Sequence, residues 1–126
     1  MVKNFGQLSS GETAHLYSLM TDMLRICVTD FGGTLVSVEV KDKSGEFVDI
    51  TLGYDDVAGY ENDNDCFGFN IGRNANRISN AQFTLNNIKY VLAKNDGENN
   101  LHSGPHLFSK RMWHVTEYRD DSIIFE

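Results

Sequence analysis

The chain has 126 residues, enough for one hydrophobic core, and its 40% hydrophobic and 23% charged residues are typical of a folded domain rather than a disordered one. Eleven Lys and Arg stand against 18 Asp and Glu, so the formal charge is −7, which disfavours nucleic acid or an anionic membrane as a partner. No segment has the length and apolarity of a transmembrane helix. Two cysteines, Cys27 and Cys66, form no disulfide framework, so we expect a reduced, cytoplasmic protein.

Apolar and polar residues alternate along much of the chain with the two-residue period of a β-strand, whereas no long segment keeps a helical period. We predict strands over 24–29, 36–41, 48–52, 83–85, 88–92, 113–118 and 122–125. Asn86-Asn87 suits the tight turn of a hairpin, because Asn tolerates a positive φ. One or two helical turns are expected over 54–60. The pattern therefore predicts an all-β fold, an antiparallel β-sandwich.

Two long polar loops, 61–80 and 94–110, are the candidate location of a functional site. The first contains Arg73, Asn74, Asn76 and Arg77, a dense set of hydrogen-bond donors that suits a ligand rich in hydroxyl groups or a carboxylate. The alternative is that these arginines pair with local acids such as Asp63 and Asp65.

The second loop contains His102, whose imidazole can donate and accept a hydrogen bond at once. The alternative is a structural histidine packed beneath the loop. His106 follows four residues later, but Pro105 lies between them, so the two imidazoles do not share a helical face. We therefore expect no metal site at these histidines.

Five segments, in this order, resemble the galactose mutarotase (aldose 1-epimerase) family, and together they cover the chain from about Arg25 onward. They are Leu52–Tyr60 (LGYDDVAGY), Gly72–Ile78 (GRNANRI), the hairpin at 83–92, Asn100–Gly104 (NLHSG) and Phe108–Trp113 (FSKRMW). The resemblance implies a large antiparallel β-supersandwich. It also implies interconversion of the α and β anomers of hexoses such as galactose and glucose, without a cofactor.

The resemblance also implies roles for three residues. Asn76 and Arg77 match the pair that hydrogen-bonds sugar hydroxyls, and His102 matches an auxiliary catalytic histidine that contacts the sugar near its ring oxygen. Arg73 and Asn74 then have supporting roles. Ser103 stands where glycine is common in the family, which is a departure from the pattern.

Family members are more than twice as long as this chain. The resemblance therefore implies that residues 1–126 are the N-terminal part of an aldose 1-epimerase domain, an incomplete supersandwich truncated before the C-terminal catalytic half. The family's acid histidine and base glutamate lie in that half. We expect the chain alone to be inactive and to self-associate through exposed sheet edges.

Two other functions stay open. One is a non-catalytic carbohydrate-binding β-domain that uses Asn76, Arg77 and His102 as a receptor. The other is a mutarotase-like protein acting on a sugar phosphate, which requires additional cations and gains no support from a charge of −7.

Overall fold

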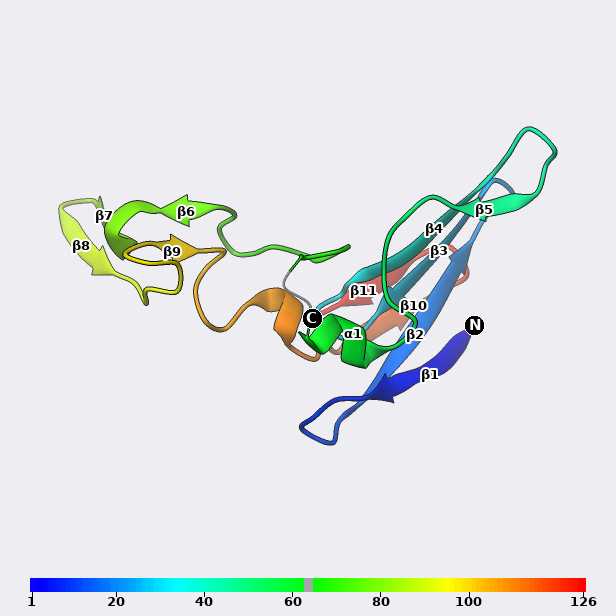
Figure 1. Cartoon of the computed structure of the whole chain (residues 1–126), viewed down its shortest axis with the longest axis horizontal. Coiled ribbons are helices and arrows are strands. Elements are labelled where there is room, and N and C mark those ends of the chain that lie inside the picture. The colour runs from blue at the N-terminus through cyan, green and yellow to red at the C-terminus, as the bar shows by residue number, and fades with distance from the viewer. Residues whose placement is uncertain (63–64) are drawn as a thin grey trace. The chain divides into compact units, whose positions relative to one another are not determined.

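The computed structural model describes residues 1–62 and 65–126, and its main element is a five-stranded sheet (Figure 1). The strands are β1 (Val2–Gln7), β2 (Thr13–Met20), β3 (Leu24–Thr29), β4 (Leu35–Lys41) and β5 (Phe47–Asp49). They lie in sequence order, and every neighbouring pair is antiparallel. The prediction of an all-β antiparallel fold is confirmed.

The chain divides into two compact units, residues 1–70 with 112–126 and residues 71–111. Besides the sheet, the first unit holds α1 (Val57–Asn62), β10 (Val115–Tyr118) and β11 (Ile123–Phe125). The second holds β6 (Arg77–Ile78), β7 (Gln82–Leu85), β8 (Ile88–Val91), β9 (Asn100–Leu101) and two short 3-10 turns, Ser79–Ala81 and Phe108–Lys110. No helix in the described residues has the length and apolar character needed to cross a lipid bilayer.

Strand β5 ends at Asp49, earlier than the alternation over 48–52 predicts. The Asp49 carboxylate accepts hydrogen bonds from Thr51 N at 3.0 Å, Thr51 Oγ1 at 2.7 Å and Val38 N at 3.2 Å. Burial raises the pKa of Asp49, but the hydrogen bonds from Thr51 and Val38 outweigh it and leave the pKa below its usual value. After Asp49 the main-chain bond from Ile50 N to Val38 O, 2.9 Å long, continues beside this network, although the strand itself has ended.

Strands β1 and β2 were not among the predicted elements, although they form one side of the sheet. In β2 the buried residues Ala14 and Leu16 alternate with His15 and Tyr17, and the small alanine weakens the hydrophobic pattern. In β1 the register shifts between Asn4 and Gly6. A bulge of this kind interrupts the two-residue period.

The β10–β11 hairpin packs against β2 within the first unit. The ring of Tyr17 meets Tyr118 and Phe125 edge-on, with centroid separations of 5.4 and 6.2 Å. The Tyr118 hydroxyl donates to Ser18 O at 2.8 Å, and Trp113 N donates to Asp30 O at 2.8 Å. Aromatic contacts and main-chain hydrogen bonds therefore join the hairpin to the sheet.

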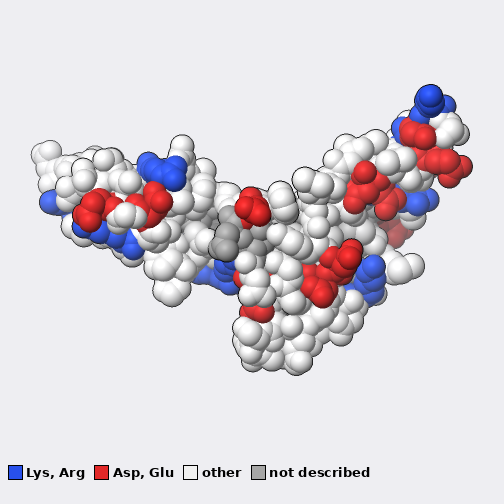
Figure 2. Space-filling view, in the orientation of Figure 1, with Lys and Arg blue, Asp and Glu red and all other residues white. Residues whose placement is uncertain are grey.

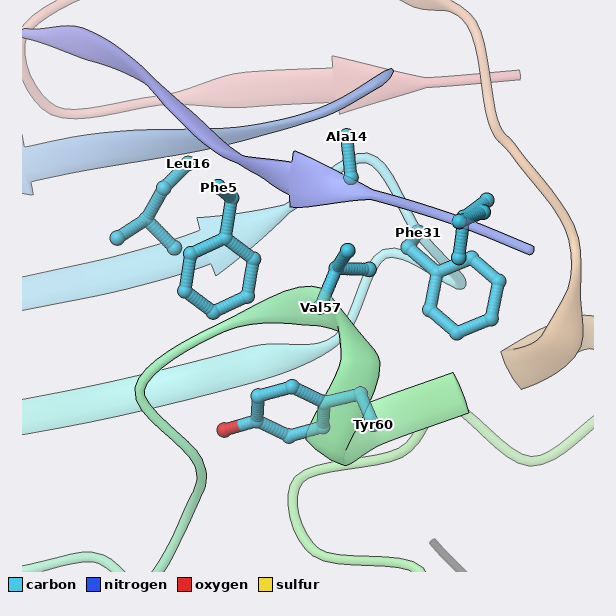
Figure 3. Close-up of a cluster of buried hydrophobic side chains, with 7 residues drawn as sticks. Phe5, Ala14, Leu16, Phe31, Val57 and Tyr60 are labelled. Atoms are coloured by element: carbon cyan, nitrogen blue, oxygen red, sulfur yellow. The ribbon is translucent and has the colours of Figure 1, made fainter. Parts of the chain in front are cut away.

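Helix α1 covers the apolar core of the first unit. Asp56 Oδ1 accepts from Gly59 N at 3.0 Å and caps the helix, which therefore begins at Val57 rather than at Tyr54 as predicted. Val57 and Tyr60, three residues apart on one face, are fully buried. Figure 3 shows both beneath strands of the sheet. The other buried core residues are Phe5, Leu8, Ala14, Leu16 and Phe31.

The second unit contains the predicted hairpin. Strands β7 and β8 pair antiparallel, and Asn86 and Asn87 turn between them with φ of 50° and 61°. Phe83 and Tyr90 are directly opposed, and their rings stack with centroids 5.0 Å apart. These rings remain 38% and 41% exposed, so the hairpin is only lightly packed.

We expect Tyr60→Ala to lower the free energy of unfolding of the first unit by about 3 kcal/mol or more, since it removes a fully buried ring. Tyr60→Phe keeps the ring but loses the hydrogen bond from Tyr54 N, 3.1 Å from the hydroxyl, and should cost about 1 kcal/mol. Urea denaturation followed by Trp113 fluorescence measures both. Leu52→Ala is the control, because Leu52 is 74% exposed. Equal effects of Tyr60→Ala and Leu52→Ala would contradict the described core.

Candidate functional site

A two-residue ladder joins the two long loops of the sequence within the second unit. Strands β6 and β9 pair antiparallel, with Arg77 opposite Leu101 and Ile78 opposite Asn100. In this register Asn76, just before β6, lies beside His102, just after β9. The structure thus places the three residues proposed from the sequence, Asn76, Arg77 and His102, at one end of this ladder.

Asn76 and His102 are held by two reciprocal hydrogen bonds, which we call the clamp. Asn76 N donates to His102 Nδ1 at 3.1 Å, and His102 N donates to Asn76 O at 3.1 Å. Both residues have positive φ, 62° and 54°. Since Nδ1 accepts, the neutral imidazole carries its proton on Nε2, and that nitrogen can donate to a ligand.

Arg77 is oriented by an acid of the second loop. Its Nε lies 2.7 Å from Asp96 Oδ2, and its Nη1 lies 3.5 Å from Asn76 Oδ1. The Arg77 side chain is 54% exposed, and an exposed ion pair contributes about 1 kcal/mol or less. The pair therefore orients the Arg77 guanidinium but adds little to the stability of the fold. Nη2 of Arg77 has no partner among the described residues.

The sequence alternative of pairing with local acids is therefore realised for Arg77, but with Asp96 rather than Asp63 or Asp65. Asp63 lies outside the described residues. Neither Asp96 nor its role was identified from the sequence, because a contact across 19 residues has no local pattern.

Ser103 adds a second link between the two loops. Its hydroxyl accepts from Asn74 N at 2.7 Å and donates to Asn74 O at 3.2 Å. Ser103 also has a positive φ of 70°, which favours glycine. The serine that departs from the family pattern thus fills a glycine-like backbone position with a hydroxyl that bridges the loops.

Other candidates stand apart from the clamp. The Arg73 guanidinium lies 5.5 Å from the centre of the Phe108 ring, and His106 is exposed. In the described part of the chain, no three His, Cys, Asp or Glu side chains come together as a metal-binding group.

The site presents hydrogen-bond donors whose orientation is set by the clamp and by the Arg77–Asp96 pair. Nη2 of Arg77 and Nε2 of His102 can donate, and the Asn76 side chain can donate and accept. Such a set is suited to a ligand with several hydroxyl groups, where each hydroxyl needs both a donor and an acceptor. It supplies no free carboxylate, because Asp96 is paired with Arg77.

Comparison with known proteins gives the following similarities. A family model described as aldose 1-epimerase matches residues 15–126. Galactose mutarotase of Bos taurus is 41% identical over 110 residues, which cover 86% of this chain and 32% of the relative. Aldose 1-epimerase of Streptococcus thermophilus is 34% identical over 119 residues, covering 94% of this chain and 34% of the relative.

Among solved structures, the GalM/aldose epimerase homologue from C. elegans superposes with a TM-score of 0.82 at 30% identity. The match covers 89% of this chain and 35% of that chain. The chain has the fold of these proteins and spans about a third of their length.

His102→Ala removes the acceptor of the Asn76 amide. We expect amide hydrogen exchange at Asn76 to become about fivefold faster, the equivalent of about 1 kcal/mol for one hydrogen bond. NMR-detected exchange is the measurement, and His106→Ala is the matched control, because His106 is exposed and outside the clamp. Unchanged exchange at Asn76 would mean that the imidazole is not its acceptor.

Ser103→Ala and Ser103→Gly separate the hydroxyl from the backbone strain. Both remove the bonds to Asn74, but only glycine relieves the positive φ, so we expect alanine to destabilise the loop by about 1 kcal/mol more than glycine. Exchange protection of the His102 amide, which donates to Asn76 O in both variants, measures the difference. Equal protection would show that strain at Ser103 has no energetic weight.

Proposed function

The chain belongs to the aldose 1-epimerase family, and we propose that it forms the hexose-binding part of an enzyme that interconverts sugar anomers. The observation that carries the proposal is the clamp, which presents His102 and Asn76 together with Arg77 from loops 26 residues apart. The proposed substrate is a hexose such as galactose or glucose.

Each of the three residues has a part in the proposed reaction. Arg77 and Asn76 hold hydroxyl groups, so that the sugar ring is fixed in one orientation. His102 donates from Nε2 toward the ring oxygen and supports the negative charge that develops there as the bond from C1 to the ring oxygen breaks. We therefore treat His102 as an auxiliary catalytic residue and Asn76 and Arg77 as binding residues.

Anomer exchange also needs a proton acceptor for the anomeric hydroxyl and a proton donor for the ring oxygen. The base takes the hydroxyl proton while the ring opens to the aldehyde, the C1–C2 bond rotates, and the ring closes from the other face. Among the residues that the structure describes, Asp96 is the one carboxylate in hydrogen-bond reach of Arg77, and it is already paired. We propose that the main acid and base belong to the parts of the relatives that this chain does not cover.

A non-catalytic carbohydrate-binding domain is the second candidate, because the same donors would serve a receptor. The two functions differ in what happens when the remaining two thirds of a family domain are supplied. An enzyme part then gains activity, whereas a receptor does not.

The proposal includes two expectations about the setting of the protein. The cytoplasm is the proposed compartment, because two cysteines in 126 residues give no disulfide framework. Self-association is proposed through β1 and β5, the outer strands of the described sheet.

We expect the 126-residue chain alone to leave the mutarotation of fresh α-D-galactose at the buffer rate, as followed by polarimetry. A chimera in which residues 15–126 replace the matching third of bovine galactose mutarotase should be active. In that chimera His102→Ala should lower kcat/KM by tens-fold, or about 2 kcal/mol.

Lys89→Ala is the matched control for the chimera, since Lys89 lies on the exposed β8 strand of the same unit. Full turnover by the 126-residue chain would show that the acid and base have been assigned to the wrong part of the family. A folded, inactive chimera that still binds galactose would favour the receptor.

A further inference from the structure

Charge is divided unevenly between the two units of the chain. Residues 71–111 hold six Lys and Arg but only two Asp and Glu, so their formal charge is +4. The other unit holds five Lys and Arg against sixteen Asp and Glu, a formal charge of −11. In Figure 2 carboxylates gather over the β1–β5 sheet. Residues 71–111 are therefore basic, although the chain as a whole has a net charge of −7.

Both carboxylates of the basic unit are already paired. Asp96 binds Arg77, and Glu98 binds Lys94. Arg73 and Arg111 consequently have no carboxylate partner among the described residues. Two guanidinium groups in one small unit, neither paired with a carboxylate that the structure describes, favour an anionic ligand.

These two arginines line one hollow of about 390 Å³ in the second unit, and His106 also lines it. Phe108 forms an apolar wall, with Arg73 5.5 Å and Arg111 5.8 Å from its ring centre. Arg111 Nη2 also donates to His106 O at 2.8 Å. The ring and the carbonyl hold the guanidinium groups in place without neutralising them.

The hollow also contains an acceptor without a donor. Asn100 lines it and is 2% exposed, and its Nδ2 donates to Ala93 O at 2.7 Å. Asn100 Oδ1 has no hydrogen-bond partner among the described residues. A buried amide oxygen left unpaired is costly, and because this atom is itself covered, a ligand hydroxyl reaches it only when the Asn100 side chain moves toward the hollow.

We propose that this hollow binds the anionic group of a sugar, with a carboxylate or phosphate on Arg73 and Arg111 and a hydroxyl on Asn100 Oδ1. The hollow adjoins the clamp, because Asn74 and Ser103 line it and are hydrogen-bonded to each other beside Asn76 and His102. The inference rests on the proposed function only in taking the ligand to be a sugar. It reopens the sugar-phosphate alternative that the net charge argued against.

The test is an NMR titration of the 126-residue chain with glucose, glucuronate, glucose 6-phosphate and inorganic phosphate at one ionic strength. We expect at least one charged sugar to bind tenfold or more tightly than glucose, with shifts at the amides of Arg73 and Arg111. Glucuronate against glucose 6-phosphate distinguishes carboxylate from phosphate.

Arg73→Gln and Arg111→Gln should each reduce that preference severalfold. Both side chains are exposed, so the fold should survive the change. Lys89→Gln removes the same charge from the same unit outside the hollow and should leave the preference intact. The comparison of charged and neutral sugars on the unchanged chain stands even where a variant fails to fold.

Equal binding of charged and neutral sugars would overturn the proposal, as would a loss with Lys89→Gln as large as with Arg73→Gln, which indicates general attraction. Inorganic phosphate binding as tightly as glucose 6-phosphate would overturn the assignment to a sugar. If charged sugars bind through Arg73 while glucose does not bind at all, the hexose function fails and this site stands. If glucose binds and the charged sugars bind no more tightly than glucose, the anion site fails and the hexose function stands.

Discussion

The clamp between Asn76 and His102 is the interaction on which the candidate site depends. Each residue donates its backbone N–H to the other, once to a carbonyl and once to the imidazole, across 26 residues of sequence. Both adopt positive φ, a conformation that costs free energy for residues other than glycine and persists when the surrounding bonds determine it. Because Nδ1 accepts the hydrogen bond from Asn76 N, Nε2 is the imidazole nitrogen that is left to donate to a ligand.

How far the sequence predicts this structure depends on whether a feature is local. The alternation over 24–29 and the Asn86-Asn87 turn are local, and the structure has a strand and a hairpin there. Strands β1 and β2 were not predicted, because a bulge in β1 and a small alanine in β2 disturb the two-residue hydrophobic period. Asn76, Arg77 and His102 were proposed through family resemblance, whereas Asp96 and Ser103 act across 19 and 29 residues, where spacing carries no signal.

The arginines of the second unit illustrate how one residue type can serve two purposes. Arg77 is neutralised by Asp96, so its remaining N–H groups suit neutral hydroxyls, and a full negative charge beside it would also meet that carboxylate. Arg73 and Arg111 lie against the Phe108 ring without a described carboxylate, so they retain their positive charge. In the two proposed sites, the position of one aspartate therefore distinguishes the arginine assigned to hydroxyl groups from the two assigned to an anion.

The two units also differ in what stabilises them. The first buries Phe5, Val57 and Tyr60, whereas Ala81 is the one buried hydrophobic side chain among the described residues of the second. Polar links across the β6–β9 ladder thus carry much of the order of the second unit, and such links are individually weak in water. A ligand that binds only the folded unit stabilises it according to its concentration and affinity. Because the second unit has the smaller core, a ligand bound there would contribute a larger share of that unit's stability than the same ligand would in the first unit.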